Sequence, residues 1–98
     1  RRWALDLLEK SFARLRAEYA GDKARLHEVL SPHLLEGEGK LPYTELARQL
    51  GMSEGAVRVA THRMRKRFGA VLRDEIGLTV ASPSEIEDEL RFLIKAVS

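Results

Sequence analysis

The stretch 43–68, YTELARQLGMSEGAVRVATHRMRKRF, constrains the fold of this chain most, because it predicts two helices joined by a very short turn. Apolar residues recur at helical spacing before the turn, at Leu46, Ala47 and Leu50. Gly51 stands where a helix ends in a left-handed residue, and Ser53 can cap a new helix that starts at Glu54. Two helices so closely joined must cross closely, which favours the small residues found at the crossing.

The second of these helices has two chemically different faces. Steps of three and four residues form an inward apolar stripe at Val57, Thr61, Met64 and Phe68. The opposite face carries mostly basic residues, namely Arg58, Val59, His62, Arg65 and Lys66, with Arg63 on its edge. Glu54 is the one acid between positions 54 and 73, and it lies at the helix start, where the helix dipole favours a negative charge. The pattern is typical of a helix-turn-helix that reads DNA with its second helix.

Composition restricts the class of protein. A chain of 98 residues predicts a single domain, 1–98, with a modest core. The net charge of +2 and the isoelectric point near 9.2 are only mildly basic, so any nucleic-acid signal comes from the position of the charges. The chain has no cysteine, no long apolar run and no signal-peptide pattern, and we expect a cytoplasmic protein without a membrane segment. It opens on Arg-Arg-Trp without a methionine, which indicates a piece of a longer protein.

The remaining sequence predicts further helices on both sides of the 43–68 stretch. The N-terminal helices occupy 1–35: an amphipathic helix ended by Gly21, a second helix capped by Asp22, and a separate helical turn capped by Ser31. The apolar stripe of the second helix in the 43–68 stretch continues to Ile76. A last helix, 83–97, begins with a capping box and an acidic first turn, SPSEIEDE. With no segment that alternates as a strand, the fold class is all-α, a helix-turn-helix without a wing.

Catalytic and metal-binding roles find no support in the sequence. The three histidines are scattered and lack a cysteine or a paired carboxylate at ligand spacing, so no metal and no cofactor is expected. No nucleophile motif occurs, and no carboxylate pair lies on an apolar face. We therefore predict that the chain is not an enzyme.

The run LGMSEGAVR followed by THRMRKRF resembles the C-terminal DNA-binding region, region 4, of bacterial RNA polymerase sigma factors, most closely those of the extracytoplasmic-function type. The resemblance covers Leu41 to about Arg73. The added N- and C-terminal helices are similar to those of sigma-like proteins of planctomycete type. The resemblance implies recognition of the minus-thirty-five promoter element and transcription initiation, with the β flap of RNA polymerase core and a possible anti-sigma factor as protein partners.

The resemblance also assigns roles to single residues. Arg58, Val59, His62 and Arg63 are expected to face bases and nearby phosphates of double-stranded promoter DNA. Arg65 and Lys66 are expected to face the phosphate backbone.

Two other readings remain open. In the first, the helices serve mainly as a protein-interaction module for RNA polymerase or an anti-sigma factor. In the second, the chain is a one-component transcription regulator that dimerises through its added helices and reads two half-sites.

Overall fold

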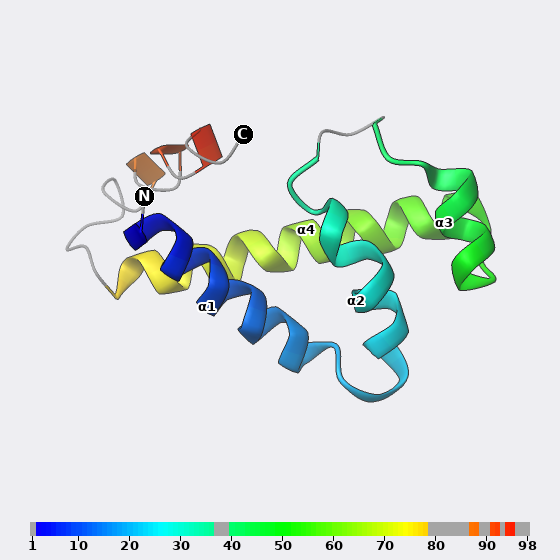
Figure 1. Ribbon diagram of the computed structural model, residues 1–98, viewed down its shortest axis with the longest axis horizontal. Helices are drawn as coiled ribbons and strands as arrows, with labels where there is room; N and C mark the ends of the chain where they lie inside the picture. The colour runs from blue at the N-terminus through cyan, green and yellow to red at the C-terminus, as the bar shows by residue number, and fades with distance from the viewer. Residues whose placement is uncertain (1, 37–39, 79–86, 89–90, 93, 96–98) are drawn as a thin grey trace. The chain divides into compact units, whose positions relative to one another are not determined.

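The computed structural model of the chain describes residues 2–36, 40–78, 87–88, 91–92 and 94–95, with side chains from residue 5 onward. The helical elements follow in the order α1 (Arg2–Glu18), η1 (Gly21–Lys23), α2 (Ala24–Leu30), η2 (Ser31–His33), α3 (Tyr43–Leu50) and α4 (Glu54–Gly77), where the two η elements are short 3-10 helices (Figure 1). No strand occurs among the described residues, and none of their helices is both long and apolar enough to cross a lipid bilayer. The prediction of an all-α chain is confirmed for this part of the chain.

The chain divides into two compact units, which we describe separately. The central unit comprises Arg16–Lys66, and the terminal unit comprises Arg1–Leu15 with Arg67–Ser98. The helices α1 and α4 each contribute residues to both units. The turn between α3 and α4 and the predicted recognition residues all belong to the central unit.

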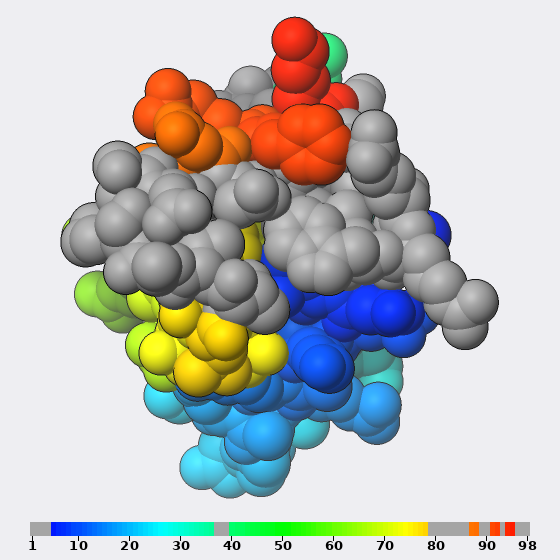
Figure 2. All heavy atoms as spheres, turned by 90° about the vertical axis from the view of Figure 1, so that its left-hand side faces the viewer, coloured from blue at the N-terminus to red at the C-terminus, as the bar shows by residue number. Residues whose placement is uncertain are grey.

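In the terminal unit, α1 packs along the C-terminal part of α4. The rings of Phe12 and Phe68 stack with centroids 4.5 Å apart and planes inclined by 27°. The buried aliphatic residues of this unit are Leu7, Leu8, Leu15, Val71, Leu72 and Ile76. Figure 2 shows the blue α1 and the yellow end of α4 side by side on one face. The predicted apolar stripes of both helices are therefore confirmed at these positions.

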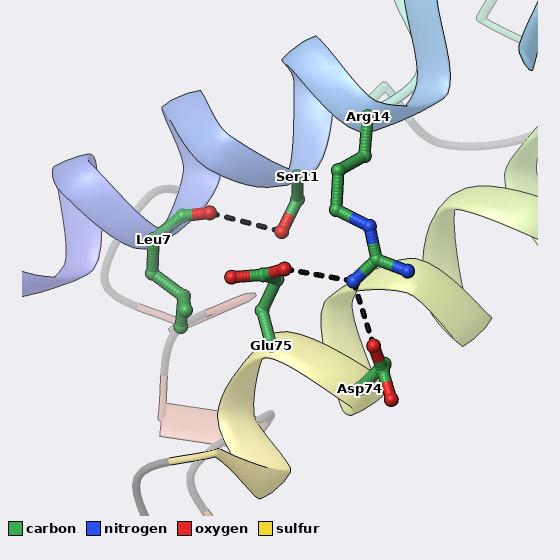
Figure 3. Close-up of polar contacts among 5 residues, drawn as sticks. All are labelled: Leu7, Ser11, Arg14, Asp74 and Glu75. Atoms are coloured by element: carbon green, nitrogen blue, oxygen red, sulfur yellow. Dashed lines mark hydrogen bonds and ion pairs between the residues drawn. The ribbon is translucent and has the colours of Figure 1, made fainter. Parts of the chain in front are cut away.

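Polar contacts accompany this core (Figure 3). The Oγ of Ser11, which is fully buried, donates a hydrogen bond of 2.9 Å to the carbonyl of Leu7. Without such a partner, a buried hydroxyl costs about 1 to 3 kcal/mol. Nη1 of Arg14 donates to the carboxylates of Asp74 and Glu75, at 2.7 Å each. The hydrogen bonds to Glu75 and then Asp74 raise the pKa of Arg14, so one guanidinium joins α1 to α4 within this unit.

In the central unit, α2 packs against α3. Its buried residues lie on α2, α3 and α4 and at two positions between η2 and α3. They are Val29, Leu30, Leu34, Leu41, Tyr43, Leu46, Ala47, Val57, Thr61 and Met64. Thr61 is buried without cost to its hydroxyl, because Oγ1 donates 2.8 Å to the carbonyl of Val57 one turn earlier. The inward stripe predicted for the second helix of the 43–68 stretch is confirmed.

Two helix caps predicted for the N-terminal region are wrong. Gly21, with φ of 71°, follows the end of α1 at Glu18. The N-cap of α2 is Lys23, which makes no side-chain cap hydrogen bond, and Asp22 lies within η1. Ser31 begins η2 rather than capping it, and its own N–H donates to the carbonyl of His27. Its φ of −58° and ψ of −35° are helical, so the chain passes from α2 into η2 without the predicted break.

The predicted C-terminal helix, 83–97, lies mostly outside the described residues. The positions that are described, 87–88, 91–92 and 94–95, are helical. Glu87 accepts a hydrogen bond of 2.9 Å from Nε of Arg73. The proposed capping box around Ser82 stays a prediction.

Candidate nucleic-acid interface

The junction between α3 and α4 is a turn of three residues, 51–53. Gly51 ends α3 in the left-handed region, with φ of 64° and ψ of 34°. Its N–H points to the carbonyls of Ala47 and Arg48, and the N–H of Met52 donates to the carbonyl of Ala47 at 3.0 Å. These bonds satisfy the carbonyls that a helix end leaves open. The predicted role of Gly51 is confirmed.

The start of α4 is held by side chains on both sides of the turn. Oγ of Ser53 accepts the N–H of Ala56 at 3.0 Å, and the carbonyl of Ser53 accepts the N–H of Val57 at 3.0 Å, which confirms Ser53 as the cap. Oγ1 of Thr44 donates to the carboxylate of Glu54 at 2.9 Å, a contact that connects the first turns of α3 and α4. This contact could not be predicted from the sequence, because the pairing of two residues ten positions apart depends on the angle of the turn.

Five of the six predicted recognition residues share one solvent face of α4. The side chains of Arg58, Val59, His62, Arg63 and Lys66 are exposed. Val59, an apolar residue, has 49% of its surface in solvent. The faces of α4 thus differ as predicted, and cations and one exposed valine lie together on a surface a partner can reach.

Arg65 departs from the prediction that it lies on the exposed face. Its side chain is half-buried, with Nε donating 3.3 Å to the carbonyl of Leu34 and Nη2 donating 3.2 Å to that of His33 and also to that of Glu36. The carbonyl of His33 also accepts the N–H of Glu36 at 3.1 Å, and all three carbonyls lie at or just after the end of η2, where a cation is favourable. Arg65 therefore caps η2 from α4, and two of its nitrogens are engaged within the protein.

Arg58 lies against an aromatic ring that is not among the predicted site residues. The centre of its guanidinium lies 3.9 Å from the ring centroid of Tyr43, the first residue of α3, which is only 9% exposed. The guanidinium of Arg58 donates no hydrogen bond to another described residue. The sequence showed only that an aromatic residue and an arginine occur near the starts of two adjacent helices, which is the arrangement that a cation–π contact needs.

The carboxylates near Arg58 are bound by other residues. Glu45 accepts hydrogen bonds of 2.8 Å and 2.5 Å from Arg48, and these lower the pKa of Glu45. Glu54 is held by Thr44. Both carboxylates line the same shallow hollow of about 480 Å³ as Tyr43 and Arg58. The cation at the edge of this hollow is therefore held by a ring rather than by an acid.

A second hollow, of about 510 Å³, lies between Arg16, Tyr19 and His27 in the central unit. Burial lowers the pKa of His27, helped by the charge of Arg16, while burial raises the pKa of Tyr19. Nε2 of His27 is buried and has no hydrogen-bond partner among the described residues. Because this atom is inaccessible, we expect His27 to affect stability and its dependence on pH rather than recognition of a partner.

Comparisons with known proteins give no relative. No protein-family model matches the chain, and neither a curated protein nor a solved structure matches it. Among the described residues, no group of three or more His, Cys, Asp or Glu side chains is placed to hold a metal ion. The case for a function therefore depends on the sequence and on the geometry of the α3–α4 surface.

Proposed function

We propose that the chain is a DNA-binding domain in which α3, the turn and α4 form a helix-turn-helix, with α4 as the helix that enters the major groove. More particularly, we propose that it is the C-terminal promoter-recognition region of an RNA polymerase sigma factor, which reads a minus-thirty-five element. This second step depends on the resemblance of the 41–73 segment.

The observation that carries the proposal is the exposed face of α4 directly after a three-residue turn. Four cationic or imidazole side chains and Val59 lie on it, and no acid occurs between Glu54 and Asp74. A solvated helix that bound nothing would have no reason to exclude acids over five turns, since mixed charges serve solubility better. A polyanion is the partner that such a face fits.

This surface offers two kinds of contact to DNA, one to phosphates and one to base edges. Arg63 and Lys66 provide charge for phosphates, and Arg58, Val59 and His62 lie closest to the start of α4, the end that approaches base edges in this class of motif. With four to six phosphates neutralised, the logarithm of affinity falls against the logarithm of salt concentration with a slope of about −4 to −5. Affinity then comes mainly from charge, whereas sequence preference comes from Arg58, Val59 and His62.

RNA polymerase core, through its β flap, and an anti-sigma factor are the protein partners of this proposal. Attachment to polymerase raises the effective concentration of a weakly binding domain near its promoter. The domain performs no chemistry in this scheme, and it positions the enzyme that does.

The test is selection of duplexes from a randomised pool by the wild-type chain and by Arg58→Ala. We expect the wild type to enrich one short motif, and Arg58→Ala to lose its preference at one base pair by about 5- to 150-fold, which corresponds to about 1 to 3 kcal/mol for a good bidentate contact. The motif should resemble an upstream promoter element.

Arg25→Ala is the matched control. Arg25 is also an exposed arginine, but it lies on α2 and pairs with Glu28, so its loss removes the same charge away from the proposed surface. Enrichment by Arg25→Ala should equal that of the wild type. A wild-type chain that enriches no motif contradicts the proposal, and a complex with polymerase or an anti-sigma factor then becomes the main reading.

A further inference from the structure

We propose that Tyr43 is a positioning residue that holds the guanidinium of Arg58 flat, so that its N–H edge meets a guanine. This inference rests on the proposed function, and it adds a residue of α3 to the determinants of sequence preference. Tyr43 itself is buried and need not touch DNA.

The Tyr43 ring is held in place by its surroundings in the central unit. Its side chain is 9% exposed beside buried Leu41, and its N–H donates 2.9 Å to the carbonyl of Leu41. The adjacent Thr44 is bound to Glu54 across the turn, which holds the first turn of α3 against the first turn of α4. The ring is thus a fixed platform rather than a mobile neighbour.

The guanidinium of Arg58 lies on this platform at a distance of 3.9 Å from the ring centroid, a separation typical of stacking of a planar cation on an aromatic face. Stacking occupies the face of the guanidinium and leaves the N–H groups in its plane unused. Those groups form the fork that matches O6 and N7 of guanine in the major groove. An arginine held in this way loses less conformational freedom on binding than one in free solution.

The carboxylates nearest to Arg58 already accept hydrogen bonds from other side chains. Glu54, one helical turn before Arg58, would ordinarily pair with it, but its carboxylate accepts from Thr44. Glu45 lines the same hollow and is bound twice by Arg48. A ring orients a cation without competing for its donors, whereas a carboxylate would have to be displaced by DNA.

The test compares Tyr43→Leu, Tyr43→Phe and Arg58→Ala on the duplex that the wild type selects and on the same duplex with the guanine exchanged. We expect Tyr43→Leu to lose the guanine preference about fivefold or more, with its affinity for random duplex and its salt slope unchanged. Tyr43→Phe keeps a stacking ring and should keep the preference. The double variant Tyr43→Leu/Arg58→Ala should discriminate no worse than Arg58→Ala alone, because both changes remove one contact.

A second measurement needs no substitution of the buried ring. In the free wild-type chain, the ring current of Tyr43 should shift the NMR signals of the Arg58 Nε–H and side-chain methylene groups upfield. Absence of this shift would overturn the inference. The inference also fails if Tyr43→Leu melts cooperatively and keeps the guanine preference. If the wild type selects no motif while the ring-current shift is present, the proposed function has failed and takes this inference with it.

Discussion

At the residue scale, adjacent basic side chains of α4 have different roles that burial decides. Lys66 is exposed, and Arg65 donates to three backbone carbonyls around the end of η2. Both were expected on the phosphate-facing side. Arg65 projects toward the segment before residue 37, so its charge contributes to stability. Lys66 does not, so its charge remains on the surface that a partner can reach.

Replacement of Arg65 by alanine is expected to lower the free energy of unfolding by about 1 to 2 kcal/mol, since hydrogen bonds from a charged donor are lost at a half-exposed site. Lys66→Ala is the matched variant: it should change stability by less than about 0.5 kcal/mol and reduce the salt slope of duplex binding by about 0.9. Urea unfolding and fluorescence anisotropy at several salt concentrations measure both effects. Equal stability of the two variants would falsify the structural role of Arg65.

At the scale of the elements, the turn depends on one backbone conformation and one cap. Gly51 has φ of 64°, while a Cβ placed on it would meet no atom within 4 Å. The requirement for glycine is therefore conformational and not a matter of space. Ser53 then starts α4 by accepting the N–H of Ala56.

Gly51→Ala is expected to cost about 1 to 2 kcal/mol, the penalty of an L-residue in the left-handed region, and Ser53→Ala about 1 kcal/mol, the usual value for a lost cap. Gly69→Ala is the control, because Gly69 lies inside α4 and its added Cβ also meets no atom within 4 Å. That change should stabilise the chain by up to about 1 kcal/mol. Thermal melts of the three variants measure this, and a destabilised Gly69→Ala with an unaffected Gly51→Ala would contradict the assignment.

At the scale of the whole molecule, the distribution of charge matters more than its sum of +2. The acids of the central unit near the basic face are bound, Glu45 by Arg48 and Glu54 by Thr44. The pH dependence of stability is expected to have two separate origins, the half-buried imidazole of His27 and the paired carboxylate of Glu45. Both have pKa values below their ordinary ones.

Stability is expected to decrease as the pH falls below about 6.5, the ordinary pKa of histidine, because unfolded His27 binds a proton that the folded chain resists. The loss levels off once the pH is below the folded pKa of His27. Glu45 contributes its own loss only as the pH falls below its ordinary value of 4.5. Melting temperatures between about pH 7.5 and pH 5 therefore report mainly on the imidazole.

The variant that tests this is His27→Gln, which should melt at nearly the same temperature across that range of pH. His62→Gln removes an imidazole that is already in solvent, and it should retain the loss in acid. If His27→Gln loses as much stability in acid as the wild type, another group is responsible.

The local features of the fold could be predicted from the sequence. The helical class, the inward stripe from Val57 to Met64, the end of α3 at Gly51 and the cap at Ser53 depend on residues within a few positions of one another. The caps predicted at Asp22 and Ser31 also depended on local residue types alone, and these two predictions were wrong. Both are residue types that favour caps, but Asp22 lies within η1 and Ser31 has helical dihedral angles at the start of η2.

What the sequence determined by itself was thus the elements, their apolar faces and the basic character of α4, because periodicity and charge act along the chain. Only the tertiary structure decided the partners of individual side chains: Tyr43 under Arg58, Thr44 with Glu54, and Arg65 on the carbonyls of η2. Those contacts join residues 10 to 32 positions apart. They depend on the angle at which helices meet, and that angle is set by the packing of all the buried side chains together.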